Sequence, residues 1–463
     1  MVDRSKKYGA VELSFTNRFY FAWNDKKSKA KRDVAIWHAK IGGTFDPNRR
    51  RIGQLVITDY DNPDTRFNQL VAKDAVSGAE MFKLPVDYQW LWNDKGSGAT
   101  NYGSIWRPIP PAGYVALSDV FTAGWEKPAR DAIWCVRRSY NGRAYVREGD
   151  VGETDLWNDR GSGADRDCSL WPIVPPAGIG DDDERLLVPV GGFTFVGHYD
   201  RPVTSPVCWV LDVPAEVKKA AGPPIPVMNG YTKPEDTQKV IDRQLTVPHT
   251  MIRDPKREPA WQFEHSPFYT VRRKHNFTLA HHLHNTSDKD QSWGRKITTG
   301  VSKATSDAFY INTSISVTTE GGIKLGPIGG KSRVNVTVET GYSTRTDVAY
   351  LKLETDEHKL VVPPHKAGAL WFAHHELESI RADNTMVPSD VAMSFDINST
   401  VVTQYPKDGP QVTHFVAVND SADEVADRMA RTAPPPDYPA ESRAQAEPDA
   451  SAREVKPGNG VGD

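Results

Sequence analysis

One spacing occurs three times in this sequence. In each case Trp-Asn-Asp is followed by a second Trp fourteen positions after the first: Trp23 and Trp37, Trp92 and Trp106, Trp157 and Trp171. Trp is a rare residue, so a constant spacing of this kind indicates an internal repeat, which has to be recognised before any fold is assigned. We therefore predict that the first half of the chain consists of three copies of one structural unit, which begin 69 and 65 residues apart.

Each copy has the local features of β structure. Tyr88, Trp90 and Trp92 alternate along the chain, which places them on one face of a strand. Asn-Asp then favours a turn, because short polar side chains bond to nearby backbone groups. Further strands are predicted at 104–107, 114–121 and 132–137. We predict an all-β fold in which residues 1–213 form a pseudo-threefold, β-prism-like module with a Trp-rich interior.

The Trp-Asn-Asp motif has two interpretations. It can be purely structural, with Trp in the core and Asn-Asp starting a turn. It can also be functional, because three equivalent loops would form a rim that binds a polar receptor group, such as a glycan or a lipid head group. The candidate receptor-binding residues are Asn24, Asp25, Asn93, Asp94, Asn158 and Asp159.

The second copy contains a fairly specific run from Ser104 to Val120, SIWRPIPPAGYVALSDV. This run resembles the signature of the vacuolar-protein-sorting-associated family related to yeast vacuolar sorting protein sixty-two. It is also similar to the adaptor-binding repeats of large lipid-transfer sorting proteins. The resemblance covers about Val11 to Pro214 and implies a recognition module rather than an enzyme. The third copy departs from it, since Trp171 is followed by Pro172 where the second copy has Arg107.

The composition changes after the repeats. Residues 214–259 are rich in Pro and are predicted to be a linker, with a strand near 239–245. From 260 to 420 we predict an elongated β module with long amphipathic strands. Two stretches in it, 309–320 and 333–339, alternate strictly between apolar and polar residues, and a Gly-bounded turn at 321–330 joins them.

This long hairpin has one apolar and one polar face, as a strand of a membrane β-barrel requires. Such strands can insert only if they close into a ring, because hydrocarbon satisfies no backbone polar group. One hairpin per chain would therefore require a homo-oligomer on the membrane. An ordinary β domain, with the alternation facing a core, is the alternative. The predicted membrane-inserting residues are Phe309, Ile311, Ile315, Val317, Ile323, Leu325, Ile328, Val334, Val336 and Val338.

The strand pattern at 361–372, 381–384 and 393–398 resembles that of aerolysin-like β-pore-forming toxins. This resemblance covers about 240 to 418. It implies a layout that pairs a receptor-binding head with an elongated pore module, and it assigns no individual binding residue.

His residues are dense in this second half. His281, His282 and His284 lie close together in sequence, and His changes its charge between pH 5 and 8. They are candidates for a pH sensor; surface polar residues and a two-ligand metal site are the other interpretations. No metal site or cofactor is predicted.

The last residues, 421–463, open with a capping box at Ser421 and Glu424 and continue as a Pro-, Ala- and Glu-rich stretch. We predict a short helix followed by a disordered tail.

Several classes of protein are excluded by what the sequence lacks. A net charge of −3 argues against a nucleic-acid partner. No nucleophile elbow, phosphate-binding loop, dinucleotide fingerprint or HExxH motif is present, so we expect no enzyme. The N-terminus lacks the apolar stretch of a signal peptide. We expect a soluble protein that leaves its cell by a non-classical route and then acts at a target membrane.

Two functions remain. The first is a toxin-like pore-forming protein that binds a surface receptor, oligomerises and inserts a β-hairpin into lipid. The second is a non-lytic glycan- or lipid-binding adaptor, or a trafficking adaptor, made of rigid β modules.

Overall fold

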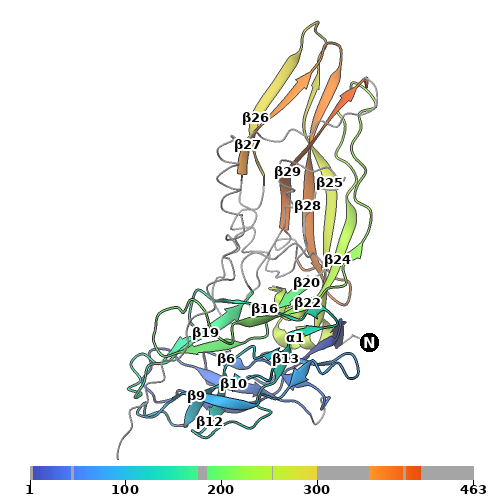
Figure 1. The fold of residues 1–463 in the computed structure, drawn as a ribbon. Helices are drawn as coiled ribbons and strands as arrows, with labels where there is room; N and C mark the ends of the chain where they lie inside the picture. Colours follow the sequence, from blue (N-terminus) through green and yellow to red (C-terminus); the bar gives the residue numbers. More distant parts are fainter. Residues whose placement is uncertain are drawn as a thin grey trace, which may run out of the picture. The chain divides into compact units, whose positions relative to one another are not determined.

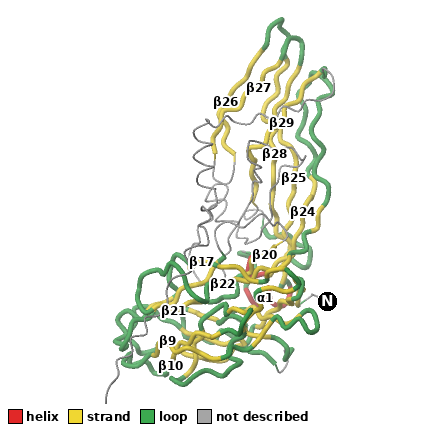
Figure 2. Tube along the Cα trace, viewed as in Figure 1, coloured by secondary structure: helices red, strands yellow, loops and turns green. Residues whose placement is uncertain are grey.

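The computed structural model describes residues 4–42, 46–175, 185–252, 254–299, 354–388 and 393–407. By its contacts the chain divides into two units, Met1–Ala417 and Val418–Asp463, and the second unit lies wholly outside the described residues. Within the described ranges the chain is almost entirely strand and loop (Figures 1 and 2). The predicted all-β fold is therefore confirmed. Among the described residues, no helix is long and apolar enough to cross a membrane.

Each repeat copy places its two signature Trp residues on neighbouring strands. The Trp-Asn-Asp strand pairs with the strand of the second Trp, which pairs with a third strand. In the first copy these are β3 (Phe19–Asn24), β4 (Ala35–Ala39) and β6 (Leu55–Ile57). In the second they are β9 (Asp87–Asn93), β10 (Gly103–Ile109) and β12 (Val120–Ala123). In the third they are β18 (Trp157–Asn158), β19 (Ser169–Val174) and β21 (Phe193–Val196).

The remaining strands of the first half form smaller sheets around these. One sheet has the order β1 (Ser5–Tyr8), β2 (Val11–Thr16), β7 (Gln69–Asp74), β5 (Arg50–Arg51). A second has the order β11 (Tyr114–Val115), β13 (Cys135–Arg137), β8 (Phe82–Lys83). A third has the order β16 (Val146–Glu148), β22 (Trp209–Pro214), β20 (Arg185–Val188). Strand β17 (Asp150–Val151) joins β19, and β14 (Ser139–Tyr140) pairs with β15 (Arg143–Ala144).

The strand predicted at 114–121 is two strands in the structure. Tyr114–Val115 pairs with β13, and Val120–Ala123 pairs with β10 in a different sheet. A break between them lets the chain pass from one sheet to the other. The part of the sheet that all three copies share has three strands, and β17 adds a fourth in the third copy; we predicted about four strands for each copy.

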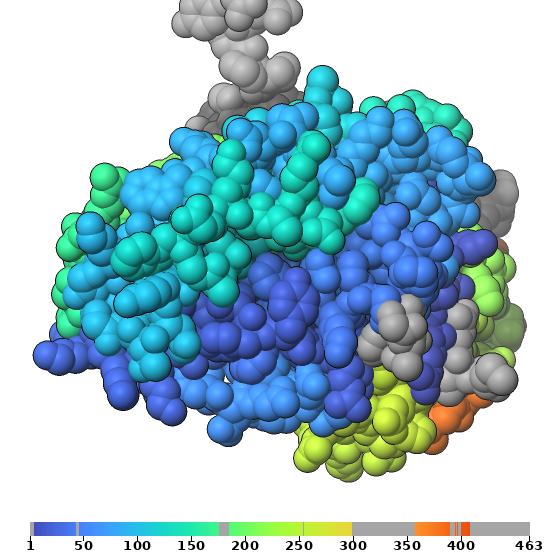
Figure 3. Space-filling view, turned by 90° about the horizontal axis from the view of Figure 1, so that it is seen from below, coloured from blue at the N-terminus to red at the C-terminus, as the bar shows by residue number. Residues whose placement is uncertain are grey.

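The centre of the repeats is an apolar cluster around the first Trp of each copy. Trp23, Trp92 and Trp157 are each only 1% exposed. The ring centroid of Trp23 lies 6.1 Å from that of Trp92 and 5.7 Å from that of Trp157, edge to face in both pairs. The prediction of a Trp-rich interior is correct. Seen from below, the face in Figure 3 is formed mostly by residues of this first half.

The second half is built on long strands that run side by side (Figure 1). The sheet has the order β23 (Lys218–Lys219), β24 (Val240–Pro248), β25 (Phe268–His284), β28 (Ala367–Ile380), β29 (Met393–Tyr405). A two-stranded ladder, β26 (Gln291–Thr299) with β27 (Glu354–Val362), accompanies it. At about 3.3 Å per residue, β25 alone is about 55 Å long.

Two short helices connect β24 to β25. These are the 3₁₀-helix η1 (His249–Met251) and the α-helix α1 (Pro259–His265). Pro259 occupies the first turn of α1, where its missing N–H is not needed. The region predicted as a linker, 214–259, thus contains β23, β24 and η1. The domain boundaries at 213, 259 and 420 stay predictions.

One hydrophobic core runs through both halves of the chain. Leu13 and Phe15 of the first sheet belong to the same buried cluster as Val247 and Phe268 of the long sheet. The hydroxyl of Tyr8 donates a hydrogen bond to the Thr246 carbonyl across this core, at 3.0 Å.

Candidate functional site

The predicted hairpin lies outside the described residues. This holds for all ten predicted membrane-inserting residues: Phe309, Ile311, Ile315, Val317, Ile323, Leu325, Ile328, Val334, Val336 and Val338. What the structure describes is the ladder from which that segment departs and to which it returns.

The ladder is a regular antiparallel pair. Gln291 is opposite Val362 at one end and Thr299 is opposite Glu354 at the other, without a bulge between them. The chain therefore leaves β26 and enters β27 at directly opposed positions, with residues 300–353 between them.

The two faces of this ladder differ. Trp293 and Ile297 of β26 are half-buried and pack against a cluster that contains Leu360 and Val362 of β27. Their neighbours on the other face are exposed, among them Lys359 and Val361. The apolar face thus uses odd-numbered residues on the first strand and even-numbered residues on the second.

The three candidate pH-sensing His residues lie at the end of β25, close to this ladder. The ring of His281 lies on the indole of Trp293, with centroids 4.2 Å apart and planes at 8°. His284 stacks on Tyr231 at 4.8 Å. Burial lowers the pKa of His281 and, with the nearby His284, that of His282. Their role as a pH sensor stays a prediction.

The Trp-Asn-Asp residues close the repeats into a ring of hydrogen bonds. The indole N–H of each copy's first Trp donates to a backbone carbonyl of another copy. Trp23 donates to Asn101, Trp92 to Arg166 and Trp157 to Arg32, at 2.8 to 2.9 Å. The first copy thus donates to the second, the second to the third, and the third to the first. This cyclic pattern is the signature of pseudo-threefold organisation.

The Asp of each motif is buried and accepts hydrogen bonds from other residues of the repeats. Asp25, Asp94 and Asp159 are 2 to 3% exposed. Asp25 accepts the backbone N–H of Val34 and Asp159 that of Cys168, both at 2.9 Å. Burial raises the pKa of Asp25 and of Asp159. These carboxylates hold the loops in shape and are not accessible to a ligand in this structure.

The Asn of each motif caps its own turn. The side-chain oxygens of Asn24, Asn93 and Asn158 accept the backbone N–H two residues later, at 3.3 to 3.4 Å. The structure therefore provides a structural role for all six motif residues. Receptor binding by the loops stays a prediction, which exposed neighbours of the motif would have to carry.

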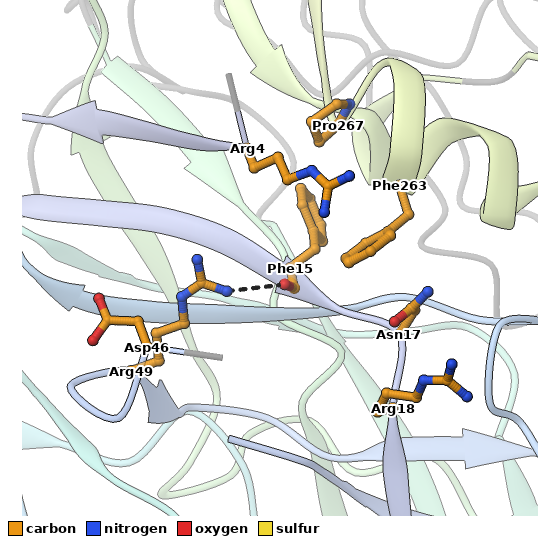
Figure 4. A pocket seen from close by; sticks show the side chains of 8 residues that line it. All are labelled: Arg4, Phe15, Asn17, Arg18, Asp46, Arg49, Phe263 and Pro267. Atoms are coloured by element: carbon orange, nitrogen blue, oxygen red, sulfur yellow. Dashed lines mark hydrogen bonds between the residues drawn. The ribbon is translucent and has the colours of Figure 1, made fainter. Parts of the chain in front are cut away.

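A separate cavity of about 390 Å³ lies where the first sheet meets α1. Its polar lining is mostly basic, and Phe15 and Phe263 supply aromatic walls (Figure 4). The guanidinium of Arg4 lies 5.7 Å from the ring centroid of Phe263. Arg49 donates to the Phe15 carbonyl at 3.2 Å, yet its buried Nε has no hydrogen-bond partner among the described residues.

The other charges of this cavity are already paired. Asp46 contacts Lys73 at 2.8 Å, and Arg18 contacts Asp64 at 3.4 Å. Burial lowers the pKa of the Arg49 guanidinium. Among the described residues Arg4 and Arg49 form no ion pair, although the carboxylates of Asp46 and Glu12 act on Arg49 from farther away. A cavity with these two cations suits a small anion that carries an apolar part.

This cavity could not be predicted from the sequence, because its residues come from separate parts of the chain. A second feature that the sequence analysis missed, the unusual residue Tyr102, can be seen in the sequence. Tyr102 stands ten residues after the first Trp of its copy, where the other copies have Asp33 and Asp167. Comparing the copies position by position would have shown that difference.

Comparison with known proteins supports the assignment of the first half. Residues 8–176 match the sequence model of the family described as vacuolar protein sorting-associated protein 62. The resemblance that the repeat signature predicted is confirmed over that part of the chain. No curated protein matches the sequence significantly.

Two solved structures share limited similarity with the chain. GNIP1Aa from Chromobacterium piscinae is 28% identical, over 41% of this chain and 34% of its own length, with a TM-score of 0.32. Cry35Ab1 is 14% identical, over 87% of this chain and 91% of its own length, with a TM-score of 0.30. The chain thus spans only about a third of GNIP1Aa. Scores of this size do not identify a fold.

Proposed function

We propose that this protein is a toxin-like β-pore-forming protein without catalytic activity. The repeat module binds a surface receptor, several chains gather on the membrane, and each contributes residues 300–353 as a β-hairpin. The observation that carries this proposal is the register of the ladder formed by β26 and β27.

In an antiparallel pair, each step forward on one strand is a step backward on its partner. Extended beyond Thr299 and Glu354, the same register would pair Ile315 with Val338 and Val317 with Val336. It would place the turn at Gly326 and Pro327, inside the Gly-bounded connection that the sequence predicts.

The same extension also fixes which way the side chains face. Directly opposed residues share a face, and a slip by one residue would move an arm's apolar set to the other face. In this extension, every one of the ten predicted membrane-inserting residues would fall on the side that Trp293 and Leu360 occupy in the ladder. The apolar–polar alternation of residues 309–339 and the strand register of β26 and β27 are independent observations, and they assign the same face to the apolar side chains.

An amphipathic hairpin of this kind requires a ring of chains, since an open edge in lipid leaves backbone groups unsatisfied. Its apolar face would meet lipid, and its Ser- and Thr-rich face would line the pore. We propose that receptor binding raises the local concentration of chains enough to start this assembly.

The test is dye leakage from vesicles of neutral, anionic and glycolipid composition, at pH 5 to 8, with and without limited proteolysis. Ile315→Asp places a charge on the lipid face, and Ser316→Asp places the same charge on the opposite face. We expect Ile315→Asp to reduce leakage at least tenfold and Ser316→Asp to retain it. Equal effects of the two variants, or no leakage by the unaltered protein in any condition, would refute the proposal.

A non-lytic adaptor is the second candidate. It is favoured by the family match of the first half and by the arginine-lined cavity, which suits the phosphate of a lipid head group. This candidate predicts binding to phosphate-bearing vesicles that is weakened by Arg49→Gln, with neither leakage nor ring-shaped oligomers in electron micrographs.

A further inference from the structure

The three repeat copies share a hydrogen bond that the sequence motif does not include. An aromatic side chain after the third strand of each copy donates to the buried motif Asp. Tyr60 donates to Asp25 at 2.9 Å, Trp125 to Asp94 at 2.7 Å, and Tyr199 to Asp159 at 3.0 Å.

The strand register shows that these three aromatic residues are equivalent. The residues that pair with the second Trp of the three copies are Leu55, Val120 and Thr194. In each copy the aromatic residue lies five positions after that paired residue. Differences between the copies at this place are therefore differences at one structural position.

In the first and third copies this position is an engaged tyrosine. The hydroxyl of Tyr60 also donates to Asp33 at 2.9 Å, and that of Tyr199 also donates to Asp167 at 2.8 Å. Asp33 and Asp167 each stand ten residues after the first Trp of their copy.

A cation covers the ring in both of these copies. Lys26 lies 5.8 Å from the ring centroid of Tyr60, and Arg160 lies 4.5 Å from that of Tyr199. Among the described residues, no cation stacks on Trp125, although Lys95 holds the corresponding position in the second copy. Within the part of the chain that the structure describes, a cation thus covers the aromatic ring in the first and third copies and not in the second.

The second copy replaces both partners together. Tyr102 stands where the other copies have Asp, and Trp125 stands where they have Tyr. The two rings lie 4.8 Å apart at 45°, and they are 64% and 39% exposed. The position that holds a hydrogen-bonded pair in the first and third copies holds an exposed aromatic pair in the second copy.

This aromatic pair is held rigidly. The backbone N–H of Gly124 donates to the Tyr102 carbonyl at 2.7 Å, so the two loops are tied together. The carboxylate that anchors Trp125 also accepts the indole N–H of the buried Trp23, at 3.0 Å. A platform fixed in this way loses little conformational entropy when a ligand binds.

We propose that Tyr102 and Trp125 form a carbohydrate site that stacks on the apolar face of a neutral hexopyranose ring. Two inclined aromatic faces suit the C–H face of such a ring. Glu126 follows Trp125 and is exposed, so its carboxylate can accept hydrogen bonds from sugar hydroxyls. The amide of Asn101, which precedes Tyr102, already donates to Asn24 at 3.0 Å. The negative carboxylate of Glu126 would be repelled by an anionic membrane surface, so a neutral glycan fits this site better than an anionic lipid does. This inference rests on the proposed function, since it names the receptor class of the repeat module.

The test converts the second copy to the pattern of the other two. Tyr102→Asp combined with Trp125→Tyr restores a pair that the fold already accommodates twice, so the variant should fold. Binding of the full chain to an array of neutral and charged glycans is measured by surface plasmon resonance. We expect the unaltered protein to bind neutral glycans and the double variant to lose at least tenfold in affinity. The control Val203→Asp, at a 92% exposed residue of the third copy, should bind as the unaltered protein does.

The inference fails if the double variant keeps its glycan affinity, or if the unaltered protein binds no glycan on the array. It also fails if the pair binds glycan-free phosphatidylcholine vesicles instead. Ile315→Asp separates this result from the pore proposal, because that variant should bind glycans normally and yet not release dye.

Discussion

The centres of the two halves of this molecule are built from different kinds of side chain. Three indoles fill the middle of the repeats, and their N–H groups bond to backbone carbonyls of neighbouring copies. The middle of the long sheet instead holds an ion pair between Arg273 and Asp242, both fully buried. Next to it His275 and His375 stack with ring centroids 4.4 Å apart.

This difference predicts different responses to solution conditions. Apolar burial does not depend on pH, and it fixes one rigid arrangement of the repeats. Buried charges are stable only while their partners remain, because each costs several kcal/mol to remove from water. We therefore expect the repeat half to keep one shape, as a recognition surface needs. The repeat half also buries an ion pair, Arg107 with Asp119, but outside its central indole cluster. A change of charge should therefore have its larger structural consequence in the long sheet.

The largest expected effect is the loss of one central indole. Trp92→Ala would leave a cavity among Trp23, Phe121 and Trp157. We expect it to lower the free energy of unfolding by about 4 kcal/mol, measured by urea denaturation with tryptophan fluorescence and circular dichroism. Val203→Ala, at an exposed site, should change it by less than about 0.5 kcal/mol. A cost below about 1 kcal/mol for Trp92→Ala would mean that the indole cluster does not hold the copies together.

The next effect tests the charged centre. Asp242→Asn leaves Arg273 buried without its carboxylate, which should cost about 3 kcal/mol. Replacing both residues, with Asp242→Asn and Arg273→Met, removes the charge altogether and should cost less than the single change. If the double variant is the less stable of the two, the sheet depends on its packing and not on this pair.

An effect of similar size, seen only in acid, concerns the contact between the halves. His249 lies in the shared core, 4.2 Å from the ring centroid of Phe15. It contacts the Asn68 amide at 3.0 Å and the Pro267 carbonyl at 3.2 Å. Burial lowers the pKa of His249 from 6.5 to about 4. In the folded state it therefore stays neutral at a pH where the unfolded chain is protonated.

Between pH 6.5 and 4 the unfolded state binds more protons than the folded state, so stability falls as the pH is lowered. The loss should approach about 3 kcal/mol below pH 4. It is read from unfolding curves at a series of pH values, and His249→Asn should flatten that dependence. His38 of the repeat half, whose pKa burial lowers to about 3, should contribute an acid dependence of its own, so His38→Gln is measured beside His249→Asn to separate the two contributions. An unchanged pH dependence in the His249 variant would show that the junction is insensitive to acid.

Much of this architecture could be predicted from the sequence, and the reason is local. The Trp spacing defined the copies, and the alternation of Tyr88, Trp90 and Trp92 located β9, because both depend on side chains a few residues apart. The prediction that these three side chains share one face is wrong, because a bulge in the pairing with β10 places Trp92 in the central cluster and Tyr88 and Trp90 in another. The junction of the halves depends on Phe15 meeting His249 and Phe268, which are far from it in sequence. A contact between residues so far apart in sequence leaves no periodic pattern from which it could be predicted. The receptor hypothesis chose the conspicuous Asn-Asp residues, whereas the exposed pair is Tyr102 and Trp125, which stand out only when the copies are compared.

The smallest expected effect separates the two interpretations of the motif. The side chain of Asn93 makes one hydrogen bond, to the backbone N–H of Lys95 at 3.3 Å. Asn93→Ala should therefore cost no more than about 1 kcal/mol. If the motif is structural, glycan binding by this variant equals that of the unaltered protein, whereas Tyr102→Ala loses it. If Asn93→Ala lowers the affinity as much as Tyr102→Ala while the unfolding curve hardly moves, the motif itself contacts the receptor. The ligand would then extend from the aromatic pair onto the turn.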